Sequence, residues 1–313
     1  MSLDPSSLQH KSVRNRLKEA LAEPAHLLSL AGIASVGLAL LSPIPILVGL
    51  VAEAAYLLFV PDSNWYTKRL EKKFDQEILD HRAALKAKIY PKVKQEIQTR
   101  FEWLEAARRQ IEATTPAQDP WFMEALRKLD FLLEKYIQFA DRQSDYINYL
   151  GTSIATNAES MGRDQVKRLP GMLQRAIANP GESYMNVLGA SLTDGEVDNM
   201  VEVLEGFYDR EIGRVKDSME SEAIMATREI MSKRHDVLVR RRDFTVRLGE
   251  VLSNLRHQMD LIYETFGLIN DEIRARSPEQ VLADINDVVS QATTLTDAID
   301  QFTPAEQLVA KLE

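Results

Sequence analysis

Hydrophobic positions divide the chain into one continuous apolar stretch and a later series of helical repeats. From Leu27 to Val60 the only ionisable side chains are Glu53 and Tyr56, and Leu, Ile, Val, Ala and Gly dominate the rest. Each Leu, Ile, Val or Phe favours bilayer insertion by about 0.3–0.6 kcal/mol, whereas one acidic side chain costs roughly 3 kcal/mol. The stretch contains 18 such residues, so its composition predicts a segment more stable in lipid than in water.

This stretch is too long for one straight span, because 34 helical residues would extend about 51 Å across a hydrocarbon core of about 30 Å. Pro43 and Pro45 lie in its middle and disfavour a continuous helix there. The pattern predicts a hydrophobic helical hairpin over 27–60 that is either re-entrant or spans a thin bilayer. A buried helical pair inside a soluble oligomer is the alternative.

Both flanks of the predicted hairpin are basic, which places both chain termini on the cytoplasmic side by the positive-inside tendency. A basic amphipathic segment is expected over 1–26, and Trp65 and Tyr66 follow the hairpin at a position typical of the membrane interface. The flanking cations are Lys11, Arg14, Arg16 and Lys18 before the hairpin, and Lys68, Arg69, Lys72 and Lys73 after it.

Small side chains recur every fourth residue at Ala31, Ser35 and Ala39, a spacing that lets two membrane helices approach closely. Packing within the hairpin is the simpler interpretation, and contact between copies is the alternative. Glu53 shares a helix face with Tyr56. Because a carboxylate inside a membrane is costly, Glu53 is expected either near the interface or facing water or a partner.

Apolar residues then recur with a helical period over most of the chain, predicting long helices over 61–150, with a kink at Pro91 and a break over 114–120. Between Leu70 and Ile111, eleven steps cover 41 residues, about 3.7 per step, which favours straight or slightly right-handed packing over a left-handed coiled coil. Asp119 and Pro120 are typical of a helix start.

The remaining chain is predicted to hold an irregular cap or elbow over 151–195, with one short helix, and a long or broken helix over 196–275. Because an unbroken helix of this length exceeds a compact domain, the element is expected either to bend around 232–236 or to form a stalk. Ser277 with Pro278, and Thr303 with Pro304, predict two short helices over 276–313. Strand-like alternation is lacking, so the fold class is all-α: a hydrophobic hairpin followed by a long, rod-like array of bundled or coiled-coil helices.

Charge adds a direction to this arrangement. Residues 61–115 contain 12 Lys and Arg against 9 Asp and Glu, whereas residues 116–313 contain 22 against 34. The basic excess therefore lies beside the hydrophobic stretch, where anionic headgroups attract it, and the acidic remainder argues against nucleic-acid binding. One basic cluster departs from this trend, and either pairs with acidic neighbours or contacts an anionic partner: Lys233, Arg234, Arg240, Arg241 and Arg242.

Motifs for catalysis, cofactors or metals are missing from the sequence. With no cysteine there are no thiolate sites, the five histidines are scattered, and no phosphate-binding loop or nucleophile elbow occurs. The sequence therefore predicts a non-enzymatic scaffold or adaptor with no cofactor, anchored in a lipid bilayer and self-associating, with a possible protein partner along its rod. An α-helical pore former, in which hairpins from several copies line an opening with Glu53 facing water, is the alternative.

Overall fold

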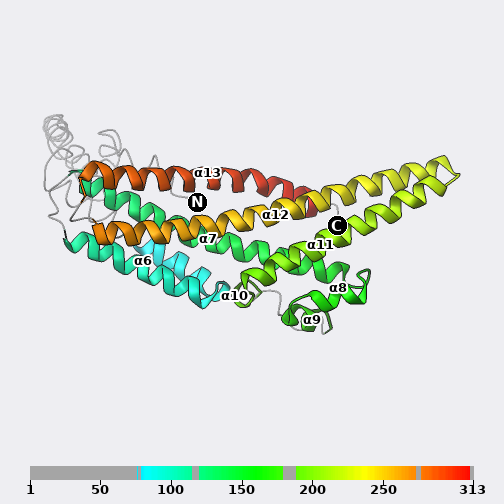
Figure 1. Ribbon diagram of the computed structural model, residues 1–313, viewed down its shortest axis with the longest axis horizontal. Helices are drawn as coiled ribbons and strands as arrows, with labels where there is room; N and C mark the ends of the chain where they lie inside the picture. Colours follow the sequence, from blue (N-terminus) through cyan, green and yellow to red (C-terminus); the bar gives the residue numbers. More distant parts are fainter. Residues whose placement is uncertain (1–75, 77–78, 115–119, 179–187, 273–275, 311–313) are drawn as a thin grey trace, which may run out of the picture. The chain divides into compact units, whose positions relative to one another are not determined.

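The computed structural model describes residues 76, 79–114, 120–178, 188–272 and 276–310 (Figure 1). By contacts the chain divides into two units, Met1–Ala84 and Leu85–Glu313. The predicted hairpin over 27–60, the basic segment over 1–26 and the interface residues from Trp65 to Lys73 lie outside the described residues. Among the helices that are described, none is both long and apolar enough to cross a bilayer.

The described residues are all-α, as predicted: every element is a helix and no strand occurs among them. Residues 79–89 are helical and run into the short 3-10 helix η1, Tyr90–Lys92. Pro91 therefore ends the helix instead of kinking it, because Val93 takes an extended conformation before α6, Gln95–Thr114, begins. The predicted break falls largely on 115–119, outside the described residues, and α7, Pro120–Asn157, starts at its proline as expected.

Helix α7 is the central element of the unit Leu85–Glu313. It contacts α6 and five later helices: α9, Gly171–Ala178, α10, Leu188–Ser191, α11, Asp194–Ser221, α12, Met225–Glu272, and α13, Pro278–Ala310. Phe131, Leu132 and Leu133 are all buried although they are consecutive, so α7 is covered on more than one side. The apolar residues that recur along α7 with a helical period are all buried: Phe122, Leu126, Leu129, Leu133, Tyr136, Ala140, Ile147 and Leu150.

The region 151–195 is more helical than an irregular elbow. Helix α7 continues through its first seven residues, and α8, Arg163–Arg168, α9 and α10, Leu188–Ser191, follow. Gly162 and Pro170 lie between these helices, whereas Gly151, Gly171 and Gly189 are part of helices. Helix α10 packs closely on α7, where a Cβ on Gly189 would lie 2.9 Å from the Cα of Ser144.

Helices α11, Asp194–Ser221, and α12, Met225–Glu272, form an antiparallel pair, and the turn between them lies beyond the ends of the other helices (Figure 1). The predicted bend at 232–236 is wrong, because the break comes ten residues earlier, at 222–224. Residues 232–236 contain neither Gly nor Pro, and their Lys and Arg favour a helix.

Helix α13, Pro278–Ala310, is a single helix where two short ones were predicted. Its start is as expected, since Ser277 and Gln280 bond reciprocally at the N-terminus. Pro304 does not end it. A proline inside a helix removes one backbone bond, and the buried face that precedes Pro304 holds the helix against α7 and α12: Val281, Ile285, Val288, Ala292 and Ile299.

Candidate functional site

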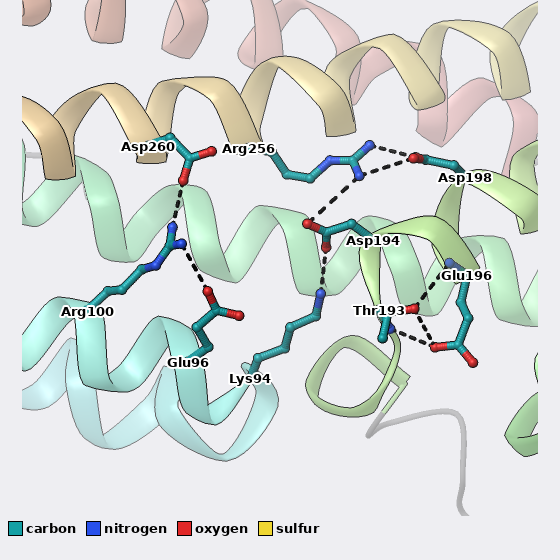
Figure 2. Close-up of polar contacts among 9 residues, drawn as sticks. All are labelled: Lys94, Glu96, Arg100, Thr193, Asp194, Glu196, Asp198, Arg256 and Asp260. Atoms are coloured by element: carbon teal, nitrogen blue, oxygen red, sulfur yellow. Dashed lines mark hydrogen bonds and ion pairs between the residues drawn. The ribbon is translucent and has the colours of Figure 1, made fainter.

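A polar cavity of about 100 Å³ opens between α6, α7, α11 and α12. Three cations line it, Lys94, Arg100 and Arg256, together with three acids, Glu96, Asp194 and Asp260. Lys94 directly precedes α6 and Arg100 lies near its start, whereas Arg256 lies on α12. Only the folded unit brings Arg256 to the other two (Figure 2). We refer to this site as the polar cavity.

Every cation of the polar cavity is paired with an acid (Figure 2). Lys94 Nζ lies 2.6 Å from Asp194 Oδ1. Arg100 bonds Asp260 Oδ1 at 2.6 Å and Glu96 Oε1 at 2.9 Å. Arg256 makes a two-pronged contact with Asp198, at 2.6 and 3.3 Å, and reaches Asp194 at 4.0 Å.

These pairings keep the guanidinium groups charged. The hydrogen bond from Arg256 to Asp198 raises the pKa of Arg256 above its ordinary value, although burial acts in the other direction. Burial likewise lowers the pKa of Arg100, but the bond to Asp260 and the charge of Glu96 more than offset it, and the net shift is upward. With Asp198, four acids surround these three cations, so the polar cavity has no positive excess that would draw an anion.

The N-terminus of α11 lies at the edge of this site and is occupied by its own cap. Thr193 Oγ1 accepts from the Glu196 amide, and the Glu196 carboxylate accepts from the Thr193 amide at 2.8 Å (Figure 2). These bonds lower the pKa of Glu196, the backbone bond contributing most. An exogenous anion would have to displace this carboxylate, so the helix terminus is not an open anion site.

Tyr136 gives the polar cavity its one buried hydroxyl. The residue is 1% exposed, its ring stacks on Phe101 with centroids 6.1 Å apart, and its hydroxyl has no hydrogen-bond partner among the described residues. Burial raises the pKa of Tyr136, so the phenol stays protonated at neutral pH. A protonated phenol among paired charges can donate one hydrogen bond, but it is not a base or a nucleophile.

The polar cavity is a network of ion pairs that links separate helices. Its ion pairs connect α6 and Lys94, the residue before it, with α11 and α12, which come from later parts of the sequence. Within the described residues no group of His, Asp and Glu side chains has the geometry of a metal site.

The predicted basic cluster lies along α12, and three of its five members pair with acids of the same chain. Lys233 pairs with Glu229 one turn away, and Arg234 reaches Glu211 on α11 at 3.5 Å. Arg242 contacts Glu205 at 3.3 Å and Asp209 at 3.1 Å. Arg240 is exposed and Arg241 is half-buried. Pairing with neighbouring acids, one of the two predicted readings, is thus what these contacts favour.

These arginines lie on a second surface, the distal hairpin, which we define as residues 209–243 of α11, the turn and α12. Among its residues only Val215 is buried. The three most exposed large hydrophobic side chains of the described chain gather at its turn, with Ile224 62% exposed, Met225 84% and Ile230 69%. Such a cluster at the end of a projecting helix pair is typical of an interaction surface.

Sequence reasoning did not find either surface. The polar cavity depends on residues up to about 160 positions apart, as in the Arg100–Asp260 pair, and helical periodicity carries no information on such pairings. The distal hairpin had one available signal, the run Ile224-Met225 followed by Ile230 within a polar stretch. The predicted membrane residues, from Leu27 to Tyr56 and from Trp65 to Lys73, lie outside the described chain.

Comparisons with known proteins give this chain no relative: no protein-family model, no curated protein and no solved structure matches it.

Proposed function

We propose that the chain is a non-enzymatic scaffold or adaptor, anchored in a lipid bilayer by its hydrophobic stretch, with both termini on the cytoplasmic side and its helices available for self-association and for a protein partner. The anchor is argued from the composition of residues 27–60 and the basic residues on both flanks. The helices are proposed to form a rod-like bundle.

The single observation that carries the scaffold role is the distal hairpin. The hairpin has one buried residue in 35, so it has little core of its own. Its turn carries the most exposed hydrophobic side chains of the described chain, which are therefore available to a binding partner. The polar cavity also supports this function, because its ion pairs hold together the parts of α11 and α12 from which the hairpin projects.

Membrane fractionation and vesicle flotation of the full chain test the anchor. We expect the protein to pellet with membranes, to resist extraction by high salt and to require detergent, because the anchor is hydrophobic. A chain that remains in the supernatant without detergent would remove the anchor and the scaffold role together.

Pore formation is the second candidate, motivated by Glu53 within the apolar stretch. Release of a trapped dye from liposomes measures it. A scaffold leaves the dye inside the liposomes, whereas a pore releases it. If Glu53 faces the water in that pore, Glu53→Leu should change the rate of dye release.

A further inference from the structure

Within the described residues, no third helix covers the distal hairpin. Helix α11 contacts α7 and α8 nearer its N-terminus, and α12 contacts α6, α7 and α13 nearer its C-terminus, but the burial along 209–243 is confined to Val215. Helices in proteins are held mainly by the packing of an apolar face. We propose that the distal hairpin binds the distal hairpin of a second copy of this chain, so that four helices share one core.

The hairpin has the apolar surface that such a core requires. Arg234 and Arg242 bond to α11 and therefore mark the side of α12 that faces its partner helix. Ile230 and Val237, seven residues apart, lie roughly a quarter turn away from that side, at 100° per residue. This lateral stripe is not covered by α11, since Ile230 remains 69% exposed and Val237 is half-exposed.

Flexible side chains continue the surface. Met219, Met225 and Met231 surround the turn, and Met225 is 84% exposed. Methionine adapts to irregular packing and is common in surfaces that bind other helices. A second helix pair laid along this stripe would cover Ile224, Met225 and Ile230 together, which neither helix of the same chain does.

The charge of the hairpin fits a second copy better than nucleic acid or anionic lipid. Residues 209–243 contain nine Lys and Arg and eight Asp and Glu, so the hairpin is close to neutral although the whole chain carries −9. Nucleic acid and anionic lipid are bound by surfaces with a clear positive excess. A nearly neutral surface with both signs interleaved does not repel its own copy, and it can form ion pairs across a two-fold interface.

This dimer interface rests on the proposed scaffold function, because it specifies the molecule that the hairpin binds. The interface can be tested separately from the membrane anchor. The chain contains no cysteine, so one introduced thiol reports one position. In the full-length protein in detergent, we expect Ile230→Cys to form a disulfide-linked dimer under mild oxidation. Ser290→Cys, at an exposed position of α13, is the matched control and should stay monomeric. Equal crosslinking of the two variants would overturn the proposal.

A second pair of variants separates the hairpin from other means of association. Met225→Ser combined with Ile230→Asp should weaken the dimer at least about tenfold by analytical ultracentrifugation, with the helical circular dichroism unchanged. Leu268→Ser removes an exposed hydrophobic side chain elsewhere on α12, 39% exposed, and should leave the dimer intact. Retention of the dimer in the double variant would contradict the hairpin interface.

Vesicle flotation of the same variants keeps the two proposals distinguishable. The double variant should still float with vesicles, because the anchor is elsewhere in the chain. If the wild type fails to float but Ile230→Cys crosslinks, the anchor is wrong and the interface stands. If the double variant keeps its dimer but loses vesicle binding, the hairpin binds lipid and the interface is wrong.

Discussion

Individual ion pairs in this protein differ greatly in how far they are removed from water. Arg108 and Asp130 join α6 to α7 through two bonds of 3.1 and 2.9 Å, with side chains only 19% and 15% exposed. Burial acts to lower the pKa of Arg108, but the adjacent Asp130 carboxylate reverses this, and the pKa is raised. By contrast, Lys233 and Glu229 are 74% and 69% exposed. Only the first pair is expected to contribute measurably to stability.

Asp130→Asn should lower the free energy of unfolding by about 2 kcal/mol. Arg108 would keep its charge in a largely buried site, with a neutral amide as its hydrogen-bond acceptor in place of a carboxylate. Urea denaturation followed by circular dichroism measures this change. Glu229→Gln is the matched control for the exposed pair, and a loss below about 0.5 kcal/mol is expected there. Equal losses in the two variants would show that burial does not decide the strength of these pairs.

Lys135 is a buried amine whose environment opposes its charge. It is 5% exposed, and burial lowers its pKa from the ordinary 10.5, although its ammonium lies 5.4 Å from the centre of the Phe131 ring. A base with a lowered pKa destabilises the folded state below that pKa, and the penalty disappears as the pH rises to 10.5, where the unfolded chain also loses the proton.

Lys135→Met should therefore raise the free energy of unfolding at neutral pH, on the order of 1 kcal/mol. The difference between variant and wild type should shrink as the pH approaches 10.5. Denaturation curves of both proteins across this range isolate the contribution of Lys135, because the other titrating groups are shared. A difference that does not change with pH would mean that shape, and not charge, is responsible.

At the scale of elements, close packing and open surface occur side by side. Gly189 on α10 meets Ser144 on α7 so closely that a Cβ would approach the backbone, whereas a Cβ on Gly213 of α11 would have nothing within 4 Å. The same substitution at these two glycines should consequently have opposite effects. At Gly189 an added Cβ would clash with α7. At Gly213 it would fit, and its main effect would be to reduce the conformational freedom of the unfolded chain.

Gly189→Ala should destabilise the protein by about 1–3 kcal/mol, since α10 must move away from α7. Gly213→Ala should stabilise it by about 0.5–1 kcal/mol, because alanine favours the helix and touches nothing. Thermal or urea unfolding of both variants measures the two signs. Destabilisation by Gly213→Ala in the dimer, but not in a dilute monomer, would indicate that this face of α11 is covered by the second copy.

The sequence predicts elements better than it predicts their partners. The end of α6 at Thr114, the start of α7 at Pro120 and the start of α13 at Pro278 follow local signals that the structure keeps. The break at 222–224 has neither glycine nor proline, and Glu222 bonds the Ile224 amide with its side chain there. The polar cavity, in turn, arises from long-range pairing, which no local signal reports.

At the scale of the whole molecule, the uneven charge is expected to orient the chain on a membrane. The predicted interface cations Lys68, Arg69, Lys72 and Lys73 would add to hydrophobic insertion by attraction to anionic headgroups. The acidic residues of 116–313 would be repelled from the same surface.

Replacing these four cations with alanine should reduce the preference for anionic over neutral vesicles, by up to about 1 kcal/mol per charge, without abolishing binding. Flotation with vesicles of both compositions at low and high salt measures the preference. Complete loss of binding to both vesicle types would mean that charge, and not the apolar stretch, holds the protein at the membrane.

Helix α12 belongs to both the distal hairpin and the core. Its 48 residues run without interruption from Met225 at the turn to the buried Ile262 and Phe266 near its far end, a length of about 72 Å. A pull on the turn would travel along one hydrogen-bonded backbone directly into the centre of the protein. In two chains joined at their turns, tension on the joint would therefore be carried into the buried core by a helix and not by a loop.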